Sequence, residues 1–235
     1  MSEILIVSNG SGYQLDKCLE IPFFKNSIKI IISDRSCPVL NVAQRHSVSH
    51  VNLNEKNSSK LNTQILKISK EKNIDYIISA GFTRILKDPL LKEYENKIFN
   101  CHPSILPAFR GFYDTRDVHR KFHARKIYER TLDFGSRVTG NTIHILTKNV
   151  DEGRPIIVSY MSIPYGEEPD YTRHRLFIQE CKSLLQIVLW LNQGRIAFDN
   201  KNYPYIVDGE YNEPWFSPNL DNENIINFNL TYPWQ

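Results

Sequence analysis

Short apolar runs alternate with longer amphipathic stretches along the first part of the chain. The apolar runs are rich in Ile, Val and Tyr and predict buried strands at residues 4–8, 28–33, 50–54 and 76–80. The stretches between them repeat apolar residues at helical spacing and predict helices at residues 14–20, 39–46 and 61–72. Strands that alternate with helices in this way are typical of βαβ units. We therefore expect an α/β fold with a Rossmann-like, mostly parallel sheet and helices on both faces.

The pattern changes after a fifth predicted strand at residues 97–102, because Pro103 and Pro107 follow it and end a regular ladder. The second half predicts a basic, partly helical stretch, two strands, and a long helix capped by Gly194, at residues 110–137, 141–147, 155–163 and 171–192. The remaining residues are rich in Asn, Pro and Tyr and favour loops, a small hairpin or a loose arm. We expect one main domain over residues 1–195 and an irregular C-terminal extension over residues 196–235.

The composition excludes several classes of protein. Hydrophobic residues make up 41% of the chain and charged residues 23%, which is ordinary for a soluble domain. A net charge of +3 is too small for bulk binding to nucleic acid, and no apolar run has the length that crosses a bilayer. With no secretory pattern at the N-terminus, we expect a cytoplasmic protein without nucleic-acid or membrane partners. The four cysteines are widely spaced and form no CxxC pair, which favours reduced thiols and no metal site.

Two polar residues with complementary chemistry stand at the end of the fifth predicted strand. Asn100 and His102 are two positions apart, so strand geometry turns both to one face and turns Cys101 to the other. Ligands of such sheets bind beyond the carboxyl ends of the strands. An amide donor beside an imidazole suits acyl transfer, because both groups stabilise a developing oxyanion. From these two residues alone, side chains that cap a turn are the simpler interpretation.

A carboxylate in a second segment strengthens the catalytic interpretation. Asp151 lies in the turn predicted between the strands at residues 141–147 and 155–163. There it would orient His102, raise the pKa of the imidazole and relay a proton through water. The alternative is an Asx-type turn, which Asp and Gly form routinely. His144, on the first of these strands, either supports such a site or packs.

Three segments carry a family resemblance. They are Asn-Cys-His-Pro-Ser-Ile-Leu-Pro from residue 100, Ala-Gly-Phe-Thr-Arg-Ile-Leu from residue 80, and the block at residues 139–157. In order and spacing they resemble the folate-dependent formyltransferases over roughly the first 195 residues, nearest to the branch that formylates glycinamide ribonucleotide. The resemblance implies a catalytic domain over residues 1–195 that takes the formyl group from 10-formyltetrahydrofolate without a metal. It also implies a cis peptide between Leu106 and Pro107.

The resemblance assigns roles to individual residues as well. It implies that Asn100, His102 and Asp151 are catalytic. The segment after the fourth predicted strand and the loop before Asp151 would line the folate pocket, at Arg84, Ile85, Leu86 and Val150. The loop after the first strand, whose small residues suit a phosphate, would hold the acceptor's phosphate, at Gly10, Ser11 and Gly12. Glu180 would hold the amine end of the acceptor.

Some positions depart from the family pattern. Gly12 stands where the family usually has Asn, and Phe177 replaces a polar residue expected to touch the ribose. Residues 110–137 form a longer and more basic segment than the family usually has, directly after the His102 loop. We expect this insert either to contact the acceptor, with Arg116 and Arg120 as first candidates, or to form a solvated amphipathic helix.

These observations favour an enzyme that transfers a formyl group from 10-formyltetrahydrofolate to a small primary amine. The first choice of acceptor is glycinamide ribonucleotide or a close phosphorylated analogue, and the alternative is an amino-sugar nucleotide. A non-catalytic folate-binding protein and a formyltetrahydrofolate hydrolase are further alternatives. The complete set of catalytic candidates argues against the non-catalytic one. The sequence leaves open whether the chain acts as a homodimer.

Overall fold

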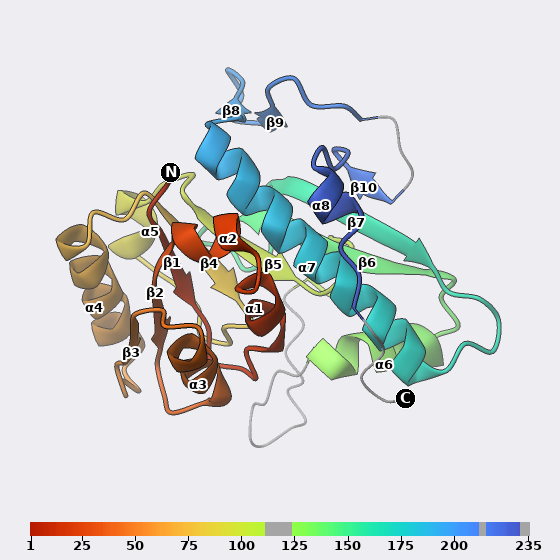
Figure 1. The fold of residues 1–235 in the computed structure, drawn as a ribbon, viewed down its shortest axis with the longest axis horizontal. Coiled ribbons are helices and arrows are strands. Elements are labelled where there is room, and N and C mark those ends of the chain that lie inside the picture. Colours follow the sequence, from red (N-terminus) through yellow and green to blue (C-terminus); the bar gives the residue numbers. More distant parts are fainter. Residues whose placement is uncertain (111–123, 212–214, 231–235) are drawn as a thin grey trace.

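A computed structural model of the chain describes residues 1–110, 124–211 and 215–230, and in these residues an eight-stranded sheet forms the centre of the fold (Figure 1). Its strands follow the order β10-β7-β6-β5-β4-β1-β2-β3. They are β1 (Ile4–Val7), β2 (Ile28–Ser33), β3 (His50–Asn52), β4 (Tyr76–Ala80), β5 (Ile98–His102), β6 (Val138–Ile145), β7 (Pro155–Ser162) and β10 (Phe216–Ser217). The strands from β3 to β5 pair in parallel, whereas β6, β7 and β10 pair antiparallel. The mostly parallel sheet expected from the sequence is confirmed.

Helices cover both faces of the sheet, as the sequence predicts. The side chains of α1, α2, α3 and α7 enter one buried cluster, and those of α4 and α5 enter the cluster on the other face. The helices are α1 (Tyr13–Cys18), α2 (Pro22–Ser27), α3 (Pro38–Arg45), α4 (Ser58–Glu71), α5 (Leu90–Glu93), α6 (Ala124–Asp133) and α7 (Pro169–Gln193). The long helix α7 runs diagonally across the sheet in Figure 1 and packs on β6 and β7.

The first strand shows why the central part of the sheet is apolar at every position. Ile4 and Ile6 of β1 enter the cluster on the α7 side, whereas Leu5 and Val7 enter the cluster on the α4 side. All of them are fully buried. A parallel strand that is covered on both faces has no solvent-facing position, so its sequence does not alternate.

Two loops meet where the strand order reverses, between β1 and β4. In the loop after β1, Asn9 donates its backbone N–H to the Gly81 carbonyl at 3.2 Å and its Nδ2 to Thr83 Oγ1 at 3.2 Å. The next strand in the sheet, β5, ends beside β4. Ligands of open α/β sheets bind outside the carboxyl ends of the strands near such a reversal, so a site is expected at this edge.

The described part of the C-terminal extension is folded against the main domain. β8 (Ile196–Phe198) and β9 (Pro204–Ile206) form the small hairpin that the sequence favours. β10 then pairs with β7, and α8 (Glu223–Ile226) packs on α7 with Ile225 fully buried. A loose arm is therefore wrong for these residues. The domain boundary at residue 195 stays a prediction.

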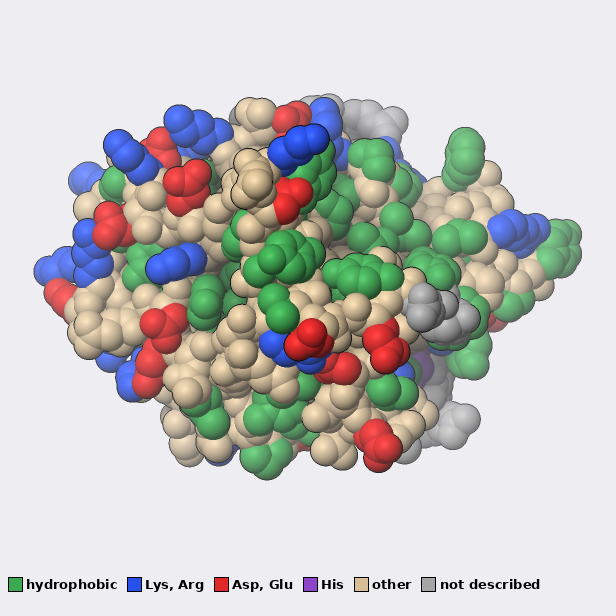
Figure 2. Space-filling model, turned by 90° about the horizontal axis from the view of Figure 1, so that it is seen from above, with side chains coloured by type: hydrophobic (Ala, Val, Ile, Leu, Met, Phe, Trp, Pro, Cys, Tyr) green, Lys and Arg blue, Asp and Glu red, His purple; other side chains and the backbone are tan. Residues whose placement is uncertain are grey.

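The surface carries charges of both signs. Figure 2 shows Lys and Arg mixed with Asp and Glu, most densely at the left end of the molecule, and apolar side chains over the centre and right. Several exposed aromatic side chains belong to the C-terminal extension, namely Tyr203, Tyr205, Tyr211 and Trp215. Among the helices that the structure describes, none combines the length and the apolar character needed to cross a membrane.

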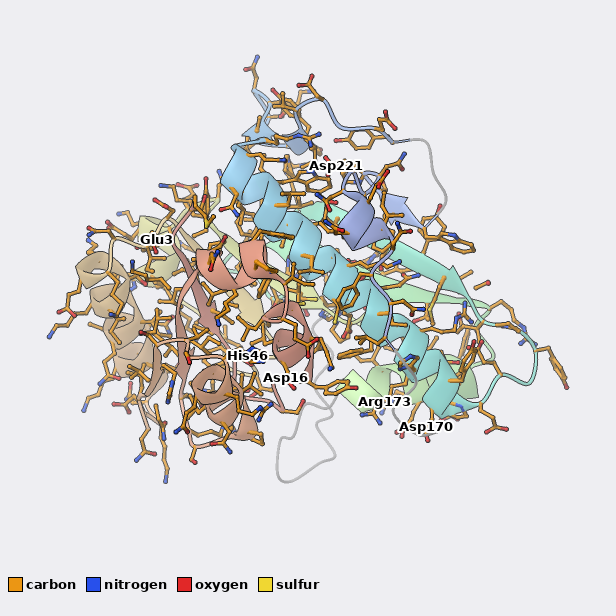
Figure 3. The ribbon with its side chains drawn as sticks, viewed as in Figure 1. Glu3, Asp16, His46, Asp170, Arg173 and Asp221 are labelled. Carbon is orange, nitrogen blue, oxygen red and sulfur yellow. The ribbon has the colours of Figure 1, made fainter. Side chains whose placement is uncertain are left out.

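Asp221 joins the extension to α7, so the replacement of Asp221 tests this arrangement (Figure 3). It accepts hydrogen bonds from Gln186 Nε2 and Trp190 Nε1, both at 2.9 Å, and forms an ion pair with Arg195. Asp221→Ala leaves the donor of the buried Trp190 without its acceptor, so we expect the free energy of unfolding to fall by about 2 kcal/mol. Urea unfolding measures this change. Glu210→Ala removes an exposed carboxylate of the same extension and should leave the stability unchanged.

Candidate active site

The carboxyl end of β5 brings the predicted polar pair together with a histidine of β6. In the antiparallel register Asn100 lies opposite His144, and His102 lies opposite Thr142. Asn100 Nδ2 is 3.1 Å from His144 Nε2. Cys101 points to the other face, where it packs against the cluster below α7. Burial raises the pKa of its thiol far above the ordinary value, which argues against a thiolate nucleophile at this position.

Asp151 lies between two imidazoles. Its Oδ1 is 3.7 Å from His102 Nδ1 and 3.6 Å from His144 Nε2. The carboxylate is mostly buried, with 12% of the side chain exposed. The structure therefore brings Asn100, His102 and Asp151 to one place, as a catalytic set requires, and it adds His144.

The turn that holds Asp151 is fixed by close backbone contacts. Asp151 adopts a φ of +55°, which Asp tolerates better than most residues. A Cβ on Gly153 would lie 1.6 Å from the Ile145 carbonyl oxygen, so only glycine allows the turn to approach the end of β6. Ile145 N–H also donates to the Arg154 carbonyl at 3.0 Å, which ties the turn to the same strand.

The hydrogen bonds of His144 set the orientation of Asn100. His144 Nδ1 is 3.0 Å from its acceptor, the carbonyl oxygen of Ile145, and therefore carries the proton of the neutral ring. Its Nε2 is then the acceptor of the Asn100 amide. An amide nitrogen has two N–H groups, so Asn100 can donate the second one to a bound ligand. Sequence reasoning identified His144 only as supporting or packing, because the β5–β6 register is not visible in one strand's pattern.

The environment of His102 acts on its pKa in both directions, and Asp151 raises this pKa, as the sequence predicts. Burial lowers the pKa more than Asp151 raises it, and His144 adds to the lowering, so the pKa comes to about 4 and the ring is neutral at pH 7. Its Nε2 is buried and has no hydrogen-bond partner among the described residues. With Nδ1–H directed at Asp151, Nε2 is left as a proton acceptor. The desolvation of the ring therefore exceeds the attraction of one carboxylate.

Among the predicted folate residues, Leu86 lies on the face of the sheet to which Ile98, Asn100 and His102 of β5 turn. Leu86 is buried in the cluster that contains Ile98, with Phe82 and Leu146 packed against it. Ile85 is 37% exposed and Val150 is half-buried. Ile85 and Val150 thus keep part of their apolar side chains at the surface. The peptide between Leu106 and Pro107 is cis, as the resemblance implies.

The Arg84 side chain turns away from that surface toward the loops at the strand reversal. It donates to Asp34 Oδ2 at 3.4 Å and to the Lys56 carbonyl at 2.6 Å. Asp34 is buried and also accepts from Asn9 Nδ2 at 2.8 Å and from Arg35 Nε at 3.2 Å. Arg35 is half exposed and is held by Thr83 Oγ1 as well, at 2.9 Å. A fixed, accessible guanidinium therefore stands beside the loop after β1.

The loop residues predicted to bind phosphate occupy the edge of the sheet next to α1. Ser11 is exposed and Gly10 is half-buried. Gly12 has a φ of +72°, and a Cβ there would meet Val39 at 2.8 Å. This contact explains why glycine stands where the family usually has Asn. The neighbouring helices are linked by Asp16 of α1, which binds His46 Nε2 at 2.8 Å and Arg45 at 2.9 Å (Figure 3).

Glu180 of α7 is buried on the α7 side of the sheet. Its Oε2 accepts from Gln14 Nε2 of α1 at 2.6 Å. Burial raises the pKa of Glu180 to about 7, and the hydrogen bond from Gln14 opposes the shift. The charge of this carboxylate also acts on Cys101, which places Glu180 near the end of β5 that carries His102. Such a carboxylate changes charge near neutral pH and can accept hydrogen bonds from a bound ligand.

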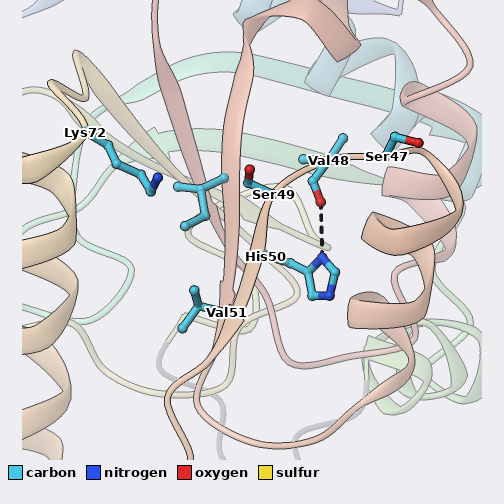
Figure 4. A pocket seen from close by; sticks show the side chains of 7 residues that line it. Ser47, Val48, Ser49, His50, Val51 and Lys72 are labelled. Atoms are coloured by element: carbon cyan, nitrogen blue, oxygen red, sulfur yellow. Dashed lines mark hydrogen bonds between the residues drawn. The ribbon is translucent and has the colours of Figure 1, made fainter.

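Two of the predicted acceptor residues, Arg116 and Arg120, lie outside the described residues. Figure 4 shows a surface depression beside β3, which β4, β1 and β2 separate from β5 in the sheet. It is lined by Ile30, Ser47, Val48, Ser49, His50, Val51 and Lys72, with His50 Nδ1 donating to the Val48 carbonyl at 3.1 Å. It contains none of the residues proposed above. Within the described ranges, no three His, Cys, Asp or Glu side chains group as metal ligands would.

Comparisons with known proteins agree with this geometry. The family model described as formyl transferase matches residues 15–188. The trifunctional purine biosynthetic protein adenosine-3 of Bos taurus is 30% identical over 194 residues, which cover 79% of this chain but only 18% of that protein. A phosphoribosylglycinamide formyltransferase of Haemophilus influenzae is 26% identical over 55% of this chain and 56% of its own length. The crystal structure of glycinamide ribonucleotide transformylase 1 from Symbiobacterium toebii has a TM-score of 0.74 and 25% identity, over 88% of this chain and 95% of that one.

Proposed function

The chain belongs to the formyl transferase family, and we propose that it transfers a formyl group from 10-formyltetrahydrofolate to glycinamide ribonucleotide or a close phosphorylated analogue. Family membership makes the protein an enzyme of formyl transfer. The relatives named above act in purine biosynthesis or carry the name of this acceptor, which supports the finer proposal. The observation that carries it is the cluster of Asn100, His102, His144 and Asp151 at the end of β5.

The residues of the cluster divide the chemistry between them. In the proposed reaction the acceptor nitrogen bonds to the formyl carbon, and the bond from that carbon to the folate nitrogen breaks. The second N–H of Asn100 donates to the formyl oxygen as negative charge develops there. His102 Nε2 takes the proton that the attacking amine must lose, and this proton passes on to the departing folate nitrogen. Asp151 stabilises the imidazolium that forms in between.

The proposal is tested by a screen of primary amines against 10-formyltetrahydrofolate, in which the release of tetrahydrofolate is followed. We expect glycinamide ribonucleotide to be the best substrate of a panel that includes amino-sugar nucleotides. A higher kcat/KM for an amino-sugar nucleotide would mean that the proposed acceptor is wrong and that the proposed formyl transfer is right. Release of tetrahydrofolate at the same rate without any amine would instead indicate a hydrolase.

We also propose that the acceptor's phosphate lies against residues 10–12 and near the guanidinium of Arg35. Ser11→Asp places a negative charge on this exposed position, so we expect the acceptor KM to rise about tenfold through repulsion, with the donor KM unchanged. Ser11→Asn has nearly the same shape without the charge and should resemble the parent. Gly12 is unsuitable for this test because any side chain there meets Val39. If both variants keep the parental acceptor KM, the phosphate lies elsewhere.

A further inference from the structure

Two aromatic side chains meet at the junction of α1 and α7. The rings of Tyr13 and Phe177 have centroids 4.4 Å apart and are tilted by 35°. Neither ring is withdrawn into the core: Tyr13 is 38% exposed, and Phe177 is half-buried. The pair therefore presents apolar surface outward although a buried cluster lies directly beneath it.

The surroundings of this pair connect it with both ends of the proposed acceptor site. Tyr13 directly follows the loop at residues 10–12. Phe177 and Glu180 are three residues apart on α7 and so share a helix face. The residue after Tyr13, Gln14, donates to Glu180 at 2.6 Å, which fixes the two helices against each other. The aromatic pair is thus held next to the proposed phosphate loop and the buried carboxylate.

The chemistry of the pair limits what it can recognise. The Phe177 ring offers no hydrogen bond to a hydroxyl group, and Tyr13 can offer one only through the phenolic oxygen at the tip of its ring. An aromatic face does, however, pack well against the C–H groups on one side of a sugar ring, through dispersion and the burial of apolar area. A sugar that passes between the phosphate loop and Glu180 would meet this face along its path.

We propose that Tyr13 and Phe177 form an apolar wall of the acceptor site, against which the carbon face of the acceptor's sugar packs. This inference rests on the proposed function and makes the acceptor class more specific. The enzyme then recognises the sugar by shape and apolar contact at this point, and only weakly by its hydroxyl groups. Sites that hydrogen-bond a substrate hydroxyl reject the analogue without it by about 10⁴-fold, whereas an apolar wall does not.

The test compares glycinamide ribonucleotide with its carbocyclic analogue that lacks both ring hydroxyls, each with saturating 10-formyltetrahydrofolate. We expect the parent enzyme to use the two acceptors with kcat/KM values within about tenfold of each other. Phe177→Leu and Tyr13→Leu should each raise the acceptor KM about tenfold for both substrates, with kcat and the donor KM unchanged. Phe177→Gln should favour the hydroxylated acceptor over the analogue more than the parent does.

Tyr160→Leu is the matched control, because it removes one ring of another half-exposed pair, Tyr160 and Trp215, on β7 and the C-terminal extension. It should leave all kinetic constants at parental values. Parental rejection of the analogue by more than about a hundredfold would overturn the wall while leaving the proposed function intact, as would unchanged acceptor KM values in both leucine variants. An absence of tetrahydrofolate release by the parent with glycinamide ribonucleotide and with every other amine of the panel would overturn the proposed function and, with it, the wall. Thermal unfolding of each variant shows whether the enzyme is still folded after the substitution.

Discussion

Asp151→Asn is expected to lower turnover by a factor of about a hundred or more while the fold and donor binding stay nearly unchanged. The amide keeps the shape of the carboxylate but cannot stabilise a positive charge on His102, whose Nδ1 is 3.7 Å from Asp151 Oδ1. Because burial already lowers the pKa of His102 to about 4, the ring depends on this carboxylate when it accepts a proton. Single-turnover kinetics with saturating donor and acceptor measure the loss.

Glu152 supplies a control in the same turn. Glu152→Gln removes an exposed carboxylate that contacts Asn149 and Arg110, and it should keep most of the activity. Near-parental turnover of the Asp151→Asn enzyme would contradict the role proposed for Asp151. Loss of activity in Cys101→Ala together with retention in His102→Ala would contradict the whole mechanism and indicate a thiol nucleophile.

The pH dependence distinguishes a His102 that acts as a base from one that must be charged at rest. With a lowered pKa, the ring is neutral at pH 7 and gains its proton only as the pH falls toward about 4. The proposed base therefore stays competent down to that range. The sequence predicts the effect of Asp151 from its position in a motif, whereas the desolvation of His102 depends on how β5, β6 and the following turn pack.

The local pattern of the sequence predicts the strands and helices of the fold more completely than it predicts the site. The strands at 28–33 and 76–80 were predicted with their observed bounds, because continuous apolar runs in a parallel sheet are long and distinct. The sequence pattern does not predict the short helices α2 and α5, because six and four residues are too few for apolar positions to repeat at helical spacing. The strand β6 begins earlier than predicted, at Val138, because its first residues are held by pairing with β7 rather than by their own propensity.

The polar groups of the site show which features a single sequence does not predict, because these features depend on contacts between distant segments. The identities of Asn100, His102 and Asp151 are read from a strand end and a turn, and the structure brings them together. The orientation of Asn100 by His144 depends on a pairing across two strands. The contact of Phe177 with Tyr13 joins residues from the first and last helices of the sheet domain. The sequence around either residue therefore does not predict this contact.

Glu180→Gln is expected to weaken acceptor binding and to stabilise the protein at the same time. Above pH 7 the parent carboxyl is ionised and accepts charge-assisted hydrogen bonds from the acceptor, so its replacement should lower acceptor kcat/KM about tenfold to a hundredfold at pH 8. In the parent, the acceptor KM should fall as the pH rises through about 7, and in the variant this dependence should disappear. Glu168→Gln, at the exposed start of the same helix, should preserve it.

The stability effect has the opposite sign because the folded state holds the proton of Glu180 more tightly than the unfolded chain does. Its pKa is raised from 4.5 to about 7, so the folded state binds more protons between these values, and stability falls as the pH rises through this window. The loss amounts to about 3 kcal/mol once the pH exceeds 7, and glutamine avoids it. Urea unfolding should therefore find the variant more stable than the parent at pH 8 by a clearly larger margin than at pH 4.5. An equal margin at both pH values would mean that Glu180 is not desolvated, and an unchanged acceptor KM would mean that this buried charge is not kept for the acceptor.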